Sequence, residues 1–152
     1  MKQVILILLL FIGFSGVSVA QEIIKNDGLY YKGDQLYTGE YTEYYTNGML
    51  KMKMNLTEGK ENGIVMIYFE TGEKKEQRSY KNGQKDGTWL TWDKNTNLTA
   101  EANFMDDLKH GHWYVWDDNG KKRYDINYEN GKKSGDWFMW DENGNLAMER
   151  KY

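Results

Sequence analysis

Apolar, glycine and polar positions recur every 24 residues from residue 39 to the end of the chain. Thr96 and Asp107 stand where the repeat otherwise has glycine. A period of this length predicts tandem copies of one supersecondary unit, here five copies at residues 39–152. The glycines of the three repeating columns are Gly39, Gly63, Gly87, Gly111 and Gly135; Gly48, Gly72, Gly120 and Gly144; and Gly59, Gly83 and Gly131.

Each unit has the pattern of a β-hairpin. In the fourth unit, residues 111–116 are aromatic and β-branched, residues 121–128 form a second candidate strand, and Asn119-Gly120 lies between them. Asn and Gly tolerate the positive φ that tight hairpin turns require. A lone hairpin is at best marginally stable. The pattern therefore predicts an all-β fold in which the five hairpins pair edge to edge into one elongated, twisted antiparallel sheet of about ten strands.

Apolar and polar residues alternate along the second strand of each hairpin, which predicts a sheet with one apolar face and one solvent-exposed polar face, called here the wet face. Two columns are expected to share the apolar face: Leu56, Tyr80, Phe104, Tyr128 and Tyr152, and Leu50, Lys74, Leu98, Lys122 and Leu146. A polar column is expected on the wet face: Lys53, Gln77, Glu101, Asp125 and Glu149.

All six tryptophans lie in the first strands of the last three units, in pairs whose members are three residues apart. In a strand of period two, such residues point to opposite faces. Either a β-bulge beside the first glycine of the unit turns one ring inward, or both faces carry aromatic surface. The second alternative leaves exposed tryptophans, which usually mark a contact surface. The candidate binding residues are therefore Trp89, Trp92, Trp113, Trp116, Trp137 and Trp140.

The first 38 residues precede the repeats. Lys2, an apolar run at residues 4–14 and Ser18-Val19-Ala20 are typical of a secretory signal peptide that is cleaved after residue 20. The run is shorter than the roughly 20 residues that cross a bilayer. We therefore expect a periplasmic or extracellular protein. Residues 21–38 are expected to form a degenerate half-repeat that caps the first hairpin.

Composition narrows the classes of partner. The chain has 20 basic and 23 acidic side chains, for a net charge of −3, and both signs alternate along it. Neutralising a nucleic-acid backbone needs clustered Lys and Arg, so we expect no nucleic-acid partner. An anionic membrane surface is disfavoured for the same reason, although membrane contact stays open. The absence of cysteine excludes disulfides, thiol catalysis and thiolate metal sites.

The histidines and paired aspartates, which could bind a metal or act in catalysis, are more simply interpreted as turn residues. His110 and His112 are the only histidines, and no third ligand recurs beside them at metal spacing, so we expect no metal site. Asp106/Asp107 and Asp117/Asp118 occupy turn positions, where Asp is favoured for its local hydrogen bonds. We expect neither a cofactor nor an enzymatic activity.

The segment Tyr80 to Trp92 and its echo from Tyr128 to Trp140 follow one pattern: Tyr, then Asn-Gly two residues on, Gly four further on, and Trp-x-x-Trp. This pattern resembles the MORN repeat in its bacterial variant form, and the resemblance covers residues 29–152. It implies an elongated sheet of hairpins that contacts proteins or lipids, without catalytic residues. Some relatives are labelled antitoxins, which fits poorly with an exported protein because a typical antitoxin meets its toxin in the cytoplasm.

Three functions remain open from the sequence. The first is binding of an unidentified protein partner in the cell envelope or outside the cell. The second is carbohydrate binding, with Trp113, Trp116, Trp137 and Trp140 as a stacking ladder whose steps recur about every 10 Å. The third is a structural role without a ligand. Self-association is also plausible, because a single-layer sheet leaves an apolar face uncovered.

Overall fold

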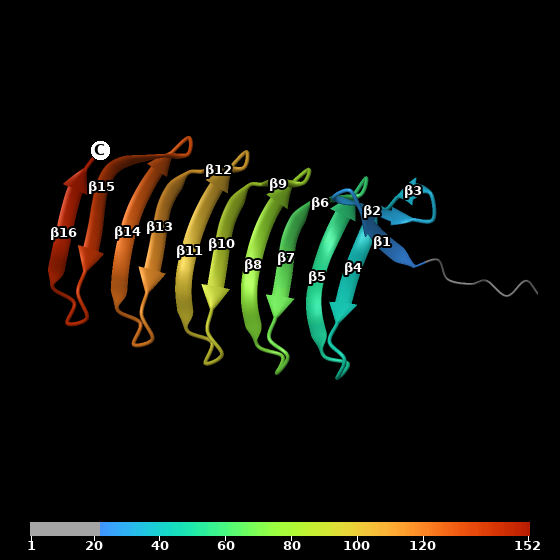
Figure 1. Cartoon of the computed structure of the whole chain (residues 1–152), viewed down its shortest axis with the longest axis horizontal. Helices are drawn as coiled ribbons and strands as arrows, with labels where there is room; N and C mark the ends of the chain where they lie inside the picture. The colour runs from blue at the N-terminus through green and yellow to red at the C-terminus, as the bar shows by residue number, and fades with distance from the viewer. Residues whose placement is uncertain (1–21) are drawn as a thin grey trace, which may run out of the picture.

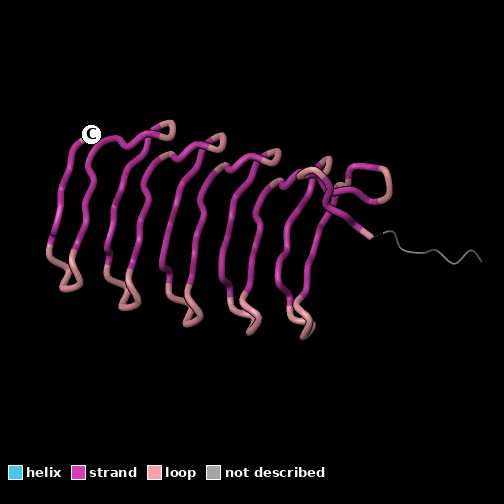
Figure 2. The backbone as a smooth tube through the Cα atoms, in the orientation of Figure 1, coloured by secondary structure: helices cyan, strands magenta, loops and turns pink. Residues whose placement is uncertain are grey.

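The computed structural model describes residues 22–152, so the predicted signal peptide at residues 1–20 lies outside the described residues. Strands follow one another in sequence order across one antiparallel sheet, joined by hairpin turns at both ends (Figure 1, Figure 2). The predicted all-β array of hairpins is confirmed. The ten long strands are β4 (Gly39–Tyr44), β5 (Leu50–Thr57), β7 (Gly63–Tyr68), β8 (Lys74–Lys81), β10 (Gly87–Trp92), β11 (Leu98–Met105), β13 (Gly111–Trp116), β14 (Lys122–Glu129), β15 (Lys132–Trp140) and β16 (Leu146–Lys151).

Three two-residue strands lie at the turns between units and complete the 13-stranded sheet. They are β6 (Lys60–Glu61), β9 (Gln84–Lys85) and β12 (Leu108–Lys109), which pair with β5, β8 and β11. Residues 22–152 contain no helix of the length and apolarity needed to span a membrane.

Consecutive units are joined in the same way each time. The first strand of a hairpin pairs with the last strand of the preceding one, as Leu90 with Gln77 and Tyr114 with Glu101. The turn between units also bonds to the unit before it, since the Gly131 N–H donates to the Lys109 carbonyl at 2.8 Å. Each unit therefore depends mainly on its neighbours, as in other repeat proteins.

Positive φ accounts for the glycine columns, including the column of Gly39, Gly63, Gly87, Gly111 and Gly135, whose members lie in strands and not in turns. All nine predicted turn glycines have positive φ, between +62° and +149°. Asp117 Oδ1 accepts hydrogen bonds from the Asn119 and Lys121 N–H groups, at 3.0 Å each, and so closes the turn around Gly120. Thr96 and Asp107, which replace glycine, have φ of +66° and +65°. The turns impose left-handed backbone even where the residue disfavours it.

The segment before the repeats folds into a separate three-stranded sheet of β1 (Ile23–Asn26), β2 (Leu29–Lys32) and β3 (Gln35–Leu36). It packs against the first hairpin instead of adding strands to the main sheet. The Tyr30 N–H donates to the Gly59 carbonyl at 2.9 Å, and a side chain at Gly59 would come within 2.9 Å of the Tyr30 carbonyl. Tyr30 is buried with Met54, Leu56 and Val65, which form the best-shielded cluster among the described residues.

The two tryptophans of each pair lie on opposite faces of the main sheet, so the second alternative from the sequence is the one observed. Face A carries Trp89, Trp113 and Trp137, and face B carries Trp92, Trp116 and Trp140. The Trp113 ring packs against Phe104 and Tyr128, with centroids 5.1 and 5.3 Å apart. The Trp116 ring instead packs against Tyr114, which points to the other side of the strand from Trp113.

A β-bulge is present in every hairpin, but it lies next to the second tryptophan column. Val115 pairs with Tyr124, whereas Trp116 pairs with Lys122, so one residue of β14 is extra. Beyond the bulge the alternation of β14 changes phase. As a result, Lys122 Nζ lies 4.1 Å from the centroid of Tyr114 on face B.

Two expectations from the sequence are therefore wrong. The column containing Lys122 does not share a face with the column containing Tyr128, because the bulge lies between them. The face with the polar column is also not simply wet, because Trp92, Trp116 and Trp140 lie on it.

Candidate binding surfaces of the sheet

Aromatic rings on face A pack in a row that crosses the strands. Each ring contacts the next at a tilted or edge-on angle, with centroids 5.0 to 5.4 Å apart, which is a favourable aromatic geometry. The row continues near the C-terminus with Trp137 and Tyr152, whose centroids are 5.9 Å apart. Its continuous part consists of Tyr80, Trp89, Phe104, Trp113 and Tyr128.

Hydrogen bonds from the indole nitrogens hold two of these tryptophans in place. Trp89 Nε1 donates to the Ser79 carbonyl at 3.0 Å, and Trp113 Nε1 donates to the Asn103 carbonyl at 2.9 Å. Trp137 Nε1 is buried without a partner. The face A tryptophans are thus packing residues of the array, with only part of each ring exposed.

A lysine lies over each tryptophan of face A. Lys85, Lys109 and Lys133 occupy the same position in successive units, and their ammonium groups are 5.0, 4.3 and 3.6 Å from the centroids of Trp89, Trp113 and Trp137. Each ammonium also lies within 5.3 Å of a second ring centroid. These are cation–π distances. Reasoning from the sequence missed these lysines, although their 24-residue spacing is visible there.

Charge on face A differs between the two ends of the array. Near the N-terminal cap, Lys25 pairs with Glu61 at 3.3 Å, and Arg78 pairs with Glu76 at 2.7 Å. From β10 to β16, the described strands place no carboxylate on face A, because the acidic residues of these strands alternate to face B. The C-terminal half of face A is therefore basic.

Face B carries a second aromatic row. The Tyr114 and Trp116 rings have centroids 5.6 Å apart, and those of Phe138 and Trp140 are 5.8 Å apart. All four rings are partly exposed. In the first unit, Tyr44 occupies the position of Trp116 and is 59% exposed. Beyond neighbours in the same sheet, no element of the described chain covers this row.

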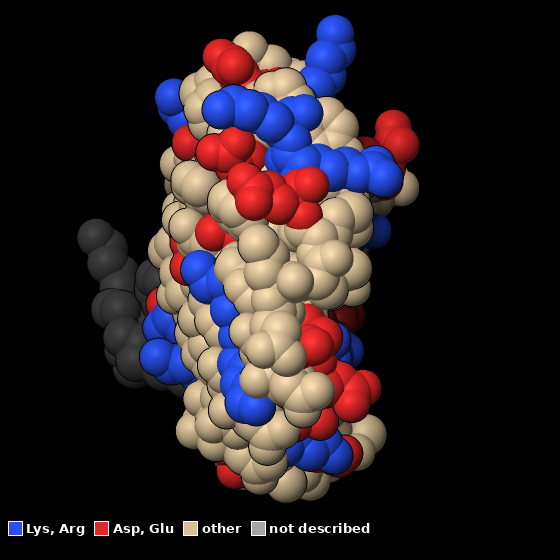
Figure 3. Space-filling model, turned by 90° about the vertical axis from the view of Figure 1, so that its left-hand side faces the viewer, with Lys and Arg blue, Asp and Glu red and all other residues tan. Residues whose placement is uncertain are grey.

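Carboxylates lie beside the face B rings. Asp125 Oδ1 is 2.9 Å from His112 Nδ1, and Asp125 Oδ2 is 3.6 Å from Lys122 Nζ. Burial, followed by the nearby charges of Asp125 and Glu101, raises the pKa of Tyr114. At the edge formed by β16, by contrast, basic and acidic side chains are mixed (Figure 3).

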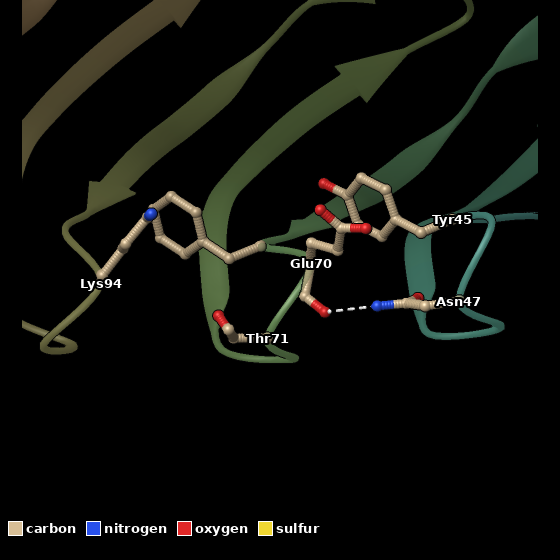
Figure 4. A pocket seen from close by; sticks show the side chains of 6 residues that line it. Tyr45, Asn47, Glu70, Thr71 and Lys94 are labelled. Carbon is tan, nitrogen blue, oxygen red and sulfur yellow. Dashed lines mark hydrogen bonds between the residues drawn. The ribbon is translucent and has the colours of Figure 1, made fainter.

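Two of the hollows in the described part of the chain lie away from the tryptophans. One, of about 470 Å³, is open between neighbouring hairpin turns, where the Asn47 amide donates to the Glu70 carbonyl at 3.3 Å (Figure 4). The other, of about 280 Å³, lies where the cap meets face A, between Lys25, Tyr30 and Arg78. The residues around the first hollow are Tyr45, Asn47, Phe69, Glu70, Thr71 and Lys94.

The histidines do not form a metal centre with their neighbours. Within residues 22–152 there is no group of three or more His, Asp or Glu side chains that could hold a metal ion. His112 contacts Asp125, and His110 Nδ1 is buried without a hydrogen-bond partner.

The family model of the MORN repeat variant matches residues 37–57, 61–82, 109–130 and 133–152. The chain belongs to the MORN repeat variant family. The matches pass over most of the third unit, in which Thr96 and Asp107 replace two of the glycines. MORN repeats are generally protein-binding modules, and the family is generally non-enzymatic.

Other comparisons add little. No curated protein matches the chain. Among solved structures, the crystal structure of a GtfA/B complex bound to UDP and GlcNAc is similar over 93% of this chain and 26% of that chain, with 11% sequence identity and a TM-score of 0.30. A likeness at this level carries no argument about function.

Proposed function

We propose that this MORN protein is a non-enzymatic module that binds another protein through face B, in the cell envelope or outside the cell. The observation that carries the proposal is the aromatic row of Trp92, Trp116 and Trp140, which is partly exposed and which no other element of the described chain covers. Exposed aromatic surface with polar residues at its border is typical of protein-binding sites.

Contacts on the two faces favour face B over face A for this role. The face A tryptophans pack against other rings and are overlaid by lysines, so their apolar surface is largely used within the chain. On face B, ring contacts join Tyr114 with Trp116 and Phe138 with Trp140; a lysine lies over Tyr114, but none among the described residues lies over Trp116 or Trp140. Carboxylates such as Glu101 and Asp125 would favour a partner that presents basic side chains around an apolar centre.

The predicted signal peptide supports a location outside the cytoplasm. It also argues against the antitoxin role suggested by the resemblance. A glycan ladder that combines Trp113 with Trp116 loses its basis, because these rings lie on opposite faces.

Site-specific photo-crosslinking in the source cells tests the proposal. A photoreactive phenylalanine analogue replaces Tyr44 on face B, and in a matched control it replaces Val115 on face A; the two sites are 59% and 39% exposed. We expect one protein adduct from the Tyr44 site that Trp116→Ala and Trp140→Ala together abolish. Equal adducts from both sites, or an adduct that survives the double substitution, would contradict binding through face B.

A further inference from the structure

Face A has its own pattern of exposed charge, which the proposed function does not use. Lys85, Lys109 and Lys133 stand in line across three successive units, each with its ammonium over aromatic rings. Lys109 and Lys133 are exposed and Lys85 is partly exposed. None of the three has a carboxylate partner within 4.0 Å among the described residues.

Three lysines of face B, by contrast, have carboxylate partners. On face B, Lys53 pairs with Glu40 at 2.7 Å, Lys122 pairs with Asp125 at 3.6 Å, and Lys151 is 3.8 Å from Asp136. These three lysines of face B are thus paired within the chain, whereas Lys85, Lys109 and Lys133 of face A are not. The uncompensated charge calls for an anionic partner.

The spacing of the lysines indicates the shape of that partner. Equivalent residues of successive units are two strands apart, which places them about 10 Å apart along the sheet. A ligand that contacts all three lysines must therefore cross the strands, above the aromatic row. A linear polymer with a regular repeat can present an anionic group to each lysine in turn.

A polysaccharide fits this path better than a peptide does. Backbone N–H and C=O groups of the inner strands are already paired with neighbouring strands, so a peptide that crosses them gains no ladder of hydrogen bonds. Extended peptides bind sheets along an edge for that reason. A sugar chain does not need backbone hydrogen bonds from the sheet, because its hydroxyls stay hydrated. Its acidic groups can contact the ammonium groups, and its ring faces can cover the exposed parts of Trp113 and Tyr128.

We propose that face A from β9 to β16 binds a linear polysaccharide that carries carboxylate groups. Lys85, Lys109 and Lys133 supply charge-assisted hydrogen bonds to successive carboxylates, and the aromatic row beneath them supplies an apolar floor. Arg150, opposite Trp137 in the pairing of β15 with β16, adds a further positive charge at the C-terminal end. The protein then has two ligands on two faces: a polymer on face A and a protein on face B.

Titration of the full chain with polygalacturonate, followed by tryptophan fluorescence and calorimetry, tests this inference. The test variant is K85Q/K109Q/K133Q, and the matched control is K53Q/K122Q/K151Q, which removes the same charge from face B. We expect the test variant to bind about tenfold more weakly or worse, because tenfold is what the loss of one charge-assisted hydrogen bond produces. The control is expected to bind like the natural chain, and binding is expected to weaken as salt screens the exposed charges.

The variant K85R/K109R/K133R separates charge from folding. It keeps the positive charges over the rings, so it is expected to retain binding even if the glutamine variant is less stable. Equal loss in both glutamine variants, or no loss in either, would overturn the assignment to face A. Equally tight binding of poly-glutamate or of anionic lipid vesicles would overturn the choice of a polysaccharide. These results are independent of the crosslinking from Tyr44, which reports on face B alone.

Discussion

Replacing Thr96 with glycine should stabilise the protein. Thr96 is a β-branched residue at φ +66°, in a turn where the equivalent position of the fourth unit is Gly120 at φ +73°. Holding a non-glycine residue in left-handed backbone costs about 1–2 kcal/mol. Relieving this strain is offset in part by about 0.4–1 kcal/mol, because the unfolded chain has more conformational freedom with glycine at this position. The exposed Thr96 side chain has no hydrogen bond among those of the described residues, so we expect a net gain of about 1 kcal/mol in the free energy of unfolding.

The reverse change at Gly120 is the matched control. A Cβ placed at Gly120 has no atom within 4 Å, so Gly120→Thr adds backbone strain without a clash. Urea unfolding followed by tryptophan fluorescence should show opposite shifts of similar size for Thr96→Gly and Gly120→Thr, with an unchanged denaturant slope. A loss of stability in Thr96→Gly, or shifts of the same sign in the two variants, would refute the argument from backbone strain.

Three further outcomes are expected. Trp113→Ala should lower the free energy of unfolding by about 3 kcal/mol, and by more than Trp116→Ala does, since it removes a ring packed between two others. Urea unfolding of both variants measures these losses. Equal losses would contradict the assignment of the packed tryptophans to face A. Gly59→Ala should loosen the cap, because its Cβ would lie 2.8 Å from Leu36 Cδ2, and faster hydrogen exchange in β2 would show it. The side-chain amide of Asn97, together with the backbone N–H groups of Asn97 and Asn95, donates hydrogen bonds that lower the pKa of Asp93. The stability that Asp93 contributes should therefore be lost as pH falls below its unfolded-state pKa of about 3.9. The Asp93→Asn variant should lose less stability between pH 7 and pH 3 than the natural chain does.

Much of the fold could be predicted because the repeat is a local signal. The turn around Gly120 is specified by Asp117, Asn119 and Gly120, all within four residues, and the same chemistry recurs in the other units. Once the hairpins are known, edge-to-edge pairing in sequence order follows, because a single hairpin cannot bury enough surface alone. The capping sheet of residues 23–36 was harder to predict, since it depends on the contact between Tyr30 and Gly59, which are far apart in sequence.

The sequence by itself determined the repeat, the hairpins, the turn positions and the identity of the six tryptophans, because period and turn chemistry act over a few residues. Only the tertiary structure decided how the faces are built. Regular alternation along β13 places Trp116 on face B, whereas the bulge beside it changes the phase of β14 and brings Lys122 to that same face, over Tyr114. Likewise, Lys109 meets Tyr128 as well as Trp113 because the pairing of β13 with β14 brings Tyr128 next to Trp113. The pleat of the sheet places the acidic side chains of β10 to β16 on face B, whereas Lys109, Lys133 and Arg150 lie on face A.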